Sequence, residues 1–139
     1  MKIALVEAGG SVWVVEVAAT AEEDAVIHER PGEALPPRPR PVELLPAFVS
    51  ESLVDIDALG PAVVVAVDRR PPLLVSADAG LTWSERGGGL PRGRAVALGD
   101  TPDDVLYAAR NRLYVSSDGA VFWRAVGVEL PEIEAIAWA

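Results

Sequence analysis

The residues of this sequence with the most evident chemistry are carboxylates that stand one or two positions apart. A glycosidase needs two carboxyl groups at a set separation across a cleft, one acting as acid and the other as base or nucleophile. Asp55 and Asp57 alternate with Val54 and Ile56, so both carboxylates are expected on one face of a strand. The other clusters are Glu22-Glu23-Asp24, Asp103-Asp104 and Glu132 with Glu134. Because proximity in sequence does not set a separation in space, these carboxylates are predicted to be solvated charges on turns and strand faces.

Three basic side chains complete the set of candidate binding residues. His28 is the only histidine, and it is predicted to be a hydrogen-bonded residue near a strand end rather than a base. Arg38 and Arg40 alternate with prolines and offer positive charge to an anionic group. The candidate binding residues are therefore His28, Arg38, Arg40, Asp55 and Asp57, and no residue is assigned a catalytic role. With no Cys and one His, neither a metal site nor a cofactor is predicted.

The composition argues against several classes of protein. The chain has 139 residues, half of them hydrophobic, which suits one domain with a buried core. Twelve Lys and Arg against 21 Asp and Glu give a net charge of −9, which argues against nucleic-acid and anionic-membrane partners. No apolar run approaches the ~20 residues of a membrane-spanning helix. The apolar stretch after Met1 is too short for a signal peptide, so a cytoplasmic protein is expected. Eleven of the 12 basic residues are Arg and there is no Gln, a bias typical of heat-adapted proteins and of GC-rich genomes.

The second half of the chain repeats itself at a shift of 40 residues. The segment LLVSADAGLTWSERGGGLP begins at Leu73, and LYVSSDGAVFWRAVGVELP begins at Leu113. Each unit contains four short apolar runs separated by turn-forming residues, and neither unit has helical periodicity. Four strands in about 40 residues, repeated, are the signature of a β-propeller blade. The predicted fold class is therefore all-β, with four-stranded antiparallel blades.

The turn between the third and fourth runs of each unit carries a specific motif. The first copy fits S-x-D-x-G-x-T-W at every defined position, with Ser76, Asp78, Gly80, Thr82 and Trp83. The second copy keeps Ser116, Asp118 and Trp123 but has Ala120 and Phe122 in place of Gly and Thr, which predicts a distorted turn.

This motif resembles the Asp-box, or BNR, repeat of sialidase-like β-propellers. In that family the boxes lie on the propeller periphery, so the resemblance implies a structural role. The carboxylate would accept turn amides, the glycine would supply a positive φ, and the tryptophan would pack against the blade. Ligand binding by the Trp83 and Trp123 pair is the less favoured alternative.

The resemblance does not extend to sialidase catalysis, which needs an arginine cluster, a Tyr nucleophile with a Glu base, and an acid. Tyr107 and Tyr114 fall at strand positions that Val67 and Leu74 occupy in the other unit, which predicts core residues. We therefore favour a non-catalytic propeller that acts as a scaffold or protein-interaction module. The alternative is a small-ligand or carbohydrate-binding protein, including a glycosidase-like enzyme, with its site at the mouth of the central channel that Asp55 and Asp57 would face.

Three blades are predicted in the chain. Residues 1–30 would supply strands two to four of a degenerate blade, with the turn TAEED at 20–24 in place of an Asp box, and residues 51–90 and 91–130 would form complete blades. Residues 30–50 form a Pro-rich insertion that contains PPRPRP. This insertion is expected to be an ordered surface loop, with docking into a partner's groove as the alternative.

The expected assembly is a homodimer. Residues 131–139 would form an orphan first strand, and three blades cannot close a ring, which needs about four to eight. The strand with Ile133, Ile136 and Trp138 would complete the first blade of a partner chain and give a six-bladed ring with two exchanged strands. An open monomer and a fragment of a longer propeller are the alternatives.

Overall fold

The computed structural model describes residues 2–18 and 25–139 of the chain. The turn expected at 20–24, with its carboxylates Glu22, Glu23 and Asp24, lies outside the described residues. Three four-stranded antiparallel sheets make up the described part, which confirms the all-β class and the four-stranded units.

In its spatial order each sheet begins with an inner strand, which is the one that contacts a neighbouring sheet's first strand. The first sheet has the order β12 (Ile133–Trp138), β1 (Lys2–Ala8), β2 (Ser11–Val17) and β3 (Ala25–Pro31). The second sheet has β4 (Leu53–Leu59), β5 (Ala62–Val67), β6 (Leu73–Ser76) and β7 (Ser84–Arg86). The third sheet has β8 (Ala95–Leu98), β9 (Val105–Ala108), β10 (Leu113–Ser116) and β11 (Arg124–Ala125).

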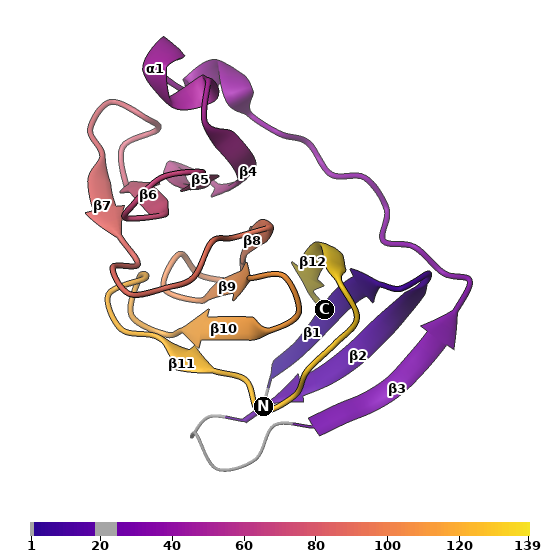
Figure 1. Cartoon of the computed structure of the whole chain (residues 1–139). Coiled ribbons are helices and arrows are strands. Elements are labelled where there is room, and N and C mark those ends of the chain that lie inside the picture. The colour runs from indigo at the N-terminus through magenta and orange to yellow at the C-terminus, as the bar shows by residue number, and fades with distance from the viewer. Residues whose placement is uncertain (1, 19–24) are drawn as a thin grey trace.

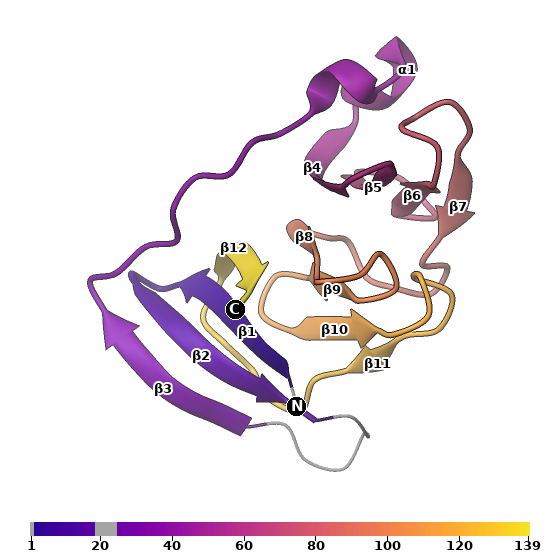
Figure 2. The same ribbon diagram turned by 180° about the vertical axis from the view of Figure 1, so that it is seen from behind.

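The sheets form an arc with the third sheet in the middle (Figures 1 and 2). Its inner strand β8 contacts the inner strands of both neighbours, β4 and β12. One apolar cluster joins the first and third sheets, and a second joins the second and third sheets around the buried ring of Tyr107. Inner strands that meet along one side and sheets that pack face to face give the chain a propeller-like arrangement.

In this structure of a single chain the first sheet takes its inner strand from the same chain, whereas the expected homodimer takes that strand from a partner chain. β12 pairs with β1 of the same chain in a register that includes Val6 with Ile136 and Ala4 with Trp138. Ile133 and Ile136 are buried in the cluster between the first and third sheets, and Trp138 packs against it. The physical reason is continuity: the third sheet ends beside the first, so β12 reaches β1 after a short connection and no second chain is needed to complete the sheet.

The fourth strands begin later than the repeats predict. The fourth run of each repeat begins at Leu81 and at Val121, which predicts strands from these residues, but β7 begins at Ser84 and β11 at Arg124. The residues before these points belong to the Asp-box turns, whose amides bond to the Asp carboxylate instead of to a neighbouring strand.

The Pro-rich insertion returns the chain from the first sheet to the second. Residues 33–41 contain no helix or strand, and they are followed by the 3₁₀ helix η1 (Val42–Leu44) and the short helix α1 (Ala47–Ser50). Figure 1 shows this segment passing along the side of the arc on which β8 and β12 lie. Val49 is buried, and with Leu44 and Leu45 it packs on β4, β5 and β6. The apolar run after the prolines therefore covers the outer face of the second sheet.

Candidate functional site

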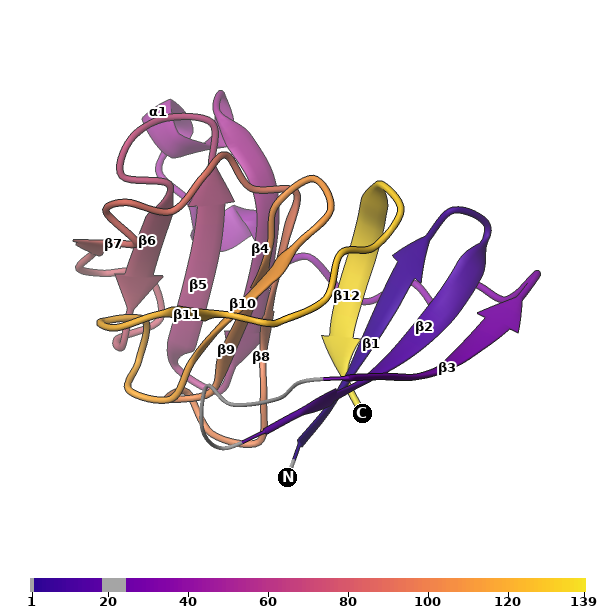
Figure 3. The same ribbon diagram turned by 60° about the horizontal axis from the view of Figure 1, so that its bottom comes forward.

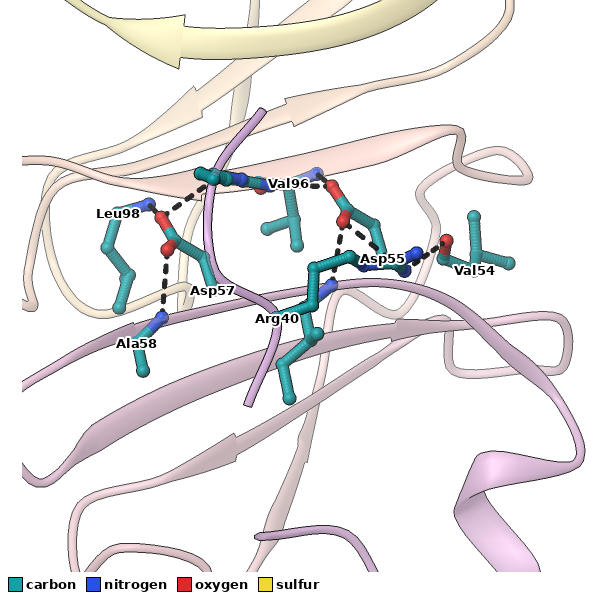
Figure 4. A network of polar contacts seen from close by, with 9 residues as sticks. Arg40, Val54, Asp55, Asp57, Ala58, Val96 and Leu98 are labelled. Carbon is teal, nitrogen blue, oxygen red and sulfur yellow. Dashed lines mark hydrogen bonds and ion pairs between the residues drawn. The ribbon is translucent and has the colours of Figure 1, made fainter. Parts of the chain in front are cut away.

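The inner strand β4 carries the two carboxylates that the sequence singles out, and both reach across to β8 (Figure 4). Asp55 Oδ2 accepts a hydrogen bond from the Val96 amide at 3.0 Å, and Asp57 Oδ2 accepts one from the Leu98 amide at 2.8 Å. β8 is the edge strand of the third sheet, so these amides have no strand partner on that side. The two carboxylates therefore take the place of a missing strand and link the second sheet to the third.

Arg38 of the Pro-rich insertion closes this network. Its Nη2 atom lies 2.8 Å from Asp55 Oδ2 and donates to the Val96 carbonyl at 2.7 Å, while its Nη1 atom lies 3.1 Å from Asp57 Oδ2. Arg40 adds a contact of 3.5 Å to Asp55 Oδ1 and donates to the Val54 carbonyl. The structure thus brings four of the five candidate binding residues together, in one network that we call the arginine clasp: Arg38, Arg40, Asp55 and Asp57.

The chemistry of the arginine clasp is that of a structural link. Asp55 and Asp57 are mostly buried, with 14% and 18% of their side chains exposed, and each accepts hydrogen bonds on both oxygens. A carboxylate that pairs with a neighbouring guanidinium and accepts hydrogen bonds from backbone amides is held in a fixed position. Sequence reasoning found these residues separately, but it had no signal that the arginines of the insertion would meet the carboxylates of β4.

A hollow of about 540 Å³ opens beside the clasp. It lies between the insertion and the inner strands, and its polar and aromatic lining includes Arg40, Arg94, Glu134 and Trp138. This hollow is the part of the structure that corresponds to the expected channel mouth.

His28 lies away from this site. It stands on β3, the outer strand of the first sheet, opposite Val14 of β2, and its side chain is exposed. The structure therefore does not join it to the other candidate binding residues.

The first Asp box forms a closed hydrogen-bonded turn. Asp78 Oδ1 accepts from the Ser76 hydroxyl at 2.8 Å and from the Thr82 amide at 2.8 Å, and Oδ2 accepts from the Thr82 hydroxyl at 2.6 Å. These bonds, led by that of the Thr82 hydroxyl, lower the pKa of Asp78 to about 2. Gly80 has a φ of +91°, and a Cβ there would come within 2.8 Å of the Leu44 carbonyl oxygen. Glycine is thus required both by the turn and by the close approach of the insertion.

The second Asp box keeps this geometry despite its changed sequence. Asp118 Oδ1 accepts from the Phe122 amide at 3.0 Å and from the Ser116 hydroxyl at 2.8 Å, and these bonds, led by that of the Phe122 amide, lower its pKa. Ala120 replaces the glycine and adopts a φ of +73°, a region that costs energy for any residue with a Cβ. The side chain of Phe122 provides no hydroxyl, so this carboxylate lacks the bond that Thr82 gives to Asp78. The turn expected to be distorted is instead retained at the cost of a strained alanine.

The tryptophans and tyrosines of the repeats are structural in this arrangement. Trp83 and Trp123 are half-buried and pack on the two adjacent apolar clusters, and Trp123 donates from Nε1 to the Ala120 carbonyl at 3.0 Å. Tyr107 is fully buried and donates to the Pro91 carbonyl, and burial raises its pKa. The Asp boxes and these rings take no part in the hydrogen bonds and ion pairs described for the arginine clasp.

Sequence reasoning missed a second group of arginines, on the loops that join β5 to β6, β7 to β8 and β9 to β10. Two hollows among these loops have Arg92 in common, and six arginines line them. The available signal was the repeat itself, because Arg70 and Arg110 occupy equivalent positions 40 residues apart.

Within residues 2–18 and 25–139, no group of three or more His, Asp or Glu side chains is placed to hold a metal ion. No helix of the described chain is long and apolar enough to span a membrane.

No family model matches the chain, and no curated protein matches it. Among solved structures, the crystal structure of the GH74 enzyme of Niastella koreensis aligns with 93% of this chain, at 20% sequence identity and a TM-score of 0.46. This chain covers 18% of that enzyme, so it spans less than a fifth of the length of the protein that it matches.

Proposed function

We propose that this protein is a non-catalytic, propeller-like scaffold that acts by binding and works as a homodimer. The observation that carries the non-catalytic part is the arginine clasp. A general acid, base or nucleophile must reach the reacting atoms. Asp55 and Asp57 are instead engaged by Arg38 and by the amides of β8, under a segment of the protein's own chain.

Hydrolysis assays test this part of the proposal. Wild type and the Asp57→Asn variant are incubated with a panel of aryl glycosides, because two carboxylates on one strand are the arrangement in the chain that most resembles a glycosidase pair. Neither protein should release the aryl group. Turnover by the wild type that the Asp57→Asn variant loses would contradict the proposal.

The outer face of the first sheet supports the dimer. Alternate residues of β1 and β2 point away from the third sheet, and among them Leu5 and Val14 are paired in register. Val14 is only 7% exposed, whereas Ile3 beside this pair is 39% exposed. At the other end of the arc, Val49 and its neighbours already cover the second sheet. The exposed Ile3 side chain on this face favours a two-fold pairing of two first sheets, in which each chain presents the same surface.

Light scattering on the purified protein tests the dimer. We expect a mass twice that of the 14.7 kDa chain. Ile3→Glu puts a charge into the proposed interface and should give a folded monomer. Leu81→Glu is the matched control, because Leu81 is 84% exposed on an Asp-box turn, and this variant should remain a dimer. A monomeric wild type, or equal behaviour of the two variants, would exclude this interface.

The hollow beside the clasp favours a second candidate function, the binding of a small ligand. Trp138 offers an aromatic surface there, and Arg40 and Glu134 offer polar partners. Titration of tryptophan fluorescence with neutral sugars, in wild type and in Glu134→Ala, separates the candidates. A saturable fluorescence change that the variant loses would favour ligand binding in this hollow over a purely structural role for its lining residues.

A further inference from the structure

Three loops on one face of the molecule carry half of its basic residues. The β5–β6 loop contributes Arg69 and Arg70, the β7–β8 loop Arg92 and Arg94, and the β9–β10 loop Arg110 and Arg112. Figure 3 shows these connections at the upper edge of the molecule, with the β11–β12 connection beside them. The chain has 12 Lys and Arg in all, so six of them gather on one face of a protein whose net charge is −9.

A hollow of about 440 Å³ lies between two of these loops. Arg92 and Arg94 line it from one loop, Arg110 and Arg112 from the other, and Tyr114 lies in its wall. A guanidinium presents its N–H donors in a planar fork that fits the two oxygens of a carboxylate or phosphate. Four forks around one hollow are suited to a molecule with more than one such group.

Both loops are held in place by bonds from buried or paired groups. The buried Tyr107 donates from its hydroxyl to the Pro91 carbonyl at 2.7 Å, and a Cβ on Gly93 would come within 2.4 Å of that hydroxyl. On the other loop, the Asn111 carbonyl accepts from the Leu130 amide at 2.9 Å. The hollow therefore has fixed walls, which reduces the entropy lost when a ligand binds.

The carboxylates that now pair with these arginines are exposed. Glu132 pairs with Arg94 and lies 3.9 Å from Arg110, and Glu129 lies 3.1 Å from Arg112. The side chains of Glu132 and Glu129 are 53% and 70% exposed, and that of Arg110 is 78% exposed. Ion pairs so open to solvent contribute little. A ligand oxyanion therefore competes with them on favourable terms. Asp68, which lies 3.0 Å from Arg92, is a third exposed carboxylate, so the four arginines of the hollow keep a net positive charge against three carboxylates.

We propose that this hollow is a binding site for a small polyanion with at least two carboxylate or phosphate groups. One anionic group contacts the Arg92 and Arg94 side and another the Arg110 and Arg112 side, with the part of the ligand that joins them next to Tyr114. The proposal adds a ligand class to the binding role proposed above. It does not depend on the dimer, because all of the lining residues come from one chain.

Calorimetric titration with citrate, pyrophosphate and inorganic phosphate, at ionic strength held constant with chloride, tests the site. Citrate and pyrophosphate separate carboxylate from phosphate ligands, and inorganic phosphate tests the need for a second anionic group. At least one of the two polyanions should bind, and more tightly than inorganic phosphate. Arg110→Gln should weaken that binding about tenfold, as expected for the loss of one charge-assisted contact.

Two further variants are titrated in the same way, one expected to tighten binding and the other to leave it unchanged. Glu132→Gln removes the carboxylate that competes for Arg94 and Arg110, so it should tighten binding. Arg30→Gln is the matched control, since it removes one exposed arginine of β3 and should leave the affinity unchanged. Absence of binding by all three anions, or equal weakening by Arg30→Gln and Arg110→Gln, would overturn the proposal. The mass of each sample, measured in parallel, shows separately whether the proposed dimer holds.

Discussion

At the scale of single residues, the two Asp boxes allow a direct comparison of one turn motif in which the Asp carboxylate accepts different sets of hydrogen bonds. The carboxylate of Asp78 accepts from Ser76 and twice from Thr82, whereas Asp118 accepts from Ser116 and from main-chain amides. Asp78→Ala should therefore lower the denaturant midpoint more than Asp118→Ala, because it leaves an additional hydroxyl without its acceptor. Urea melts of the two variants measure the difference, and equal losses would contradict this order.

The acid stability of the protein should also depend on Asp78. Its pKa in the folded state is about 2, below the ordinary Asp value of 3.8. A folded pKa that is depressed means that the native state binds the proton less tightly than the unfolded chain does. The stabilisation is thus complete above pH 4 and is lost as the pH falls from about 4 towards 2.

Melts at several pH values in this window test the linkage. Asp78→Asn should show a shallower loss of stability between pH 4 and pH 2 than the wild type, since it has no carboxylate to titrate. Asp100→Asn is the control with the same change in charge, at an exposed position outside the boxes, and it should follow the wild-type slope.

The arginine clasp gives a prediction of stability for Arg38. Arg38→Gln leaves the partly buried carboxylate of Asp57 without a cation and that of Asp55 with Arg40 alone, and loss of one member of such a network costs about 1–3 kcal/mol. Arg30→Gln removes the same charge from an exposed site and should have little effect. If both variants unfold at the same urea concentration, the clasp does not stabilise the fold.

At the scale of elements, the source of β12 is testable by a disulfide. Leu5 and Ala137 are register partners in adjacent antiparallel strands, at a separation that suits a disulfide, and the natural chain has no cysteine. The Leu5→Cys/Ala137→Cys variant should oxidise within one chain and run as a monomer on a denaturing, non-reducing gel. The two single-cysteine variants control for links between chains. A covalent dimer formed only by the double variant would restore the exchanged strand.

The repeat made the second and third sheets predictable, because turn residues and apolar runs recur at a fixed spacing. The position of β12 along the chain also followed from counting strands in the repeats. Whether β12 pairs with β1 of its own chain or of a second chain did not follow, because its sequence would be the same in both cases. The arginine clasp was unpredictable for a different reason. Its ion pairs join Arg38 and Arg40 of a Pro-rich segment with no periodic pattern to carboxylates 15 to 19 positions further along the chain, and neither charge nor spacing specifies where such a segment lies.

At the scale of the whole molecule, the order of the sheets in space differs from their order along the chain. The spatial order is second, third, first, and the insertion carries the chain from the last sheet back to the beginning of the arc (Figure 2). The two ends of the described chain are adjacent, since the Ala139 amide donates to the Ile3 carbonyl at 2.8 Å. If the ends were joined, β12 and β1 would form a hairpin, and all three sheets would be continuous antiparallel meanders.

This arrangement predicts that a circular permutant folds. Ala139 is joined to Lys2 through Asn-Gly, a pair suited to a tight hairpin turn, and the chain is opened between the exposed residues Glu33 and Ala34. The new chain keeps Arg38 and the residues that cover the second sheet attached to that sheet, and the apolar clusters contain no residue at the opened site. We expect the circular dichroism spectrum of the parent and one cooperative urea transition. The variant that opens instead between Ala97 and Leu98 is the control, because it cuts β8 in the middle of the arc, and it should lose the cooperative transition. A permutant opened at Glu33 that fails to fold, while the natural chain folds, would mean that the insertion itself and not the packing of the three sheets holds the arc together.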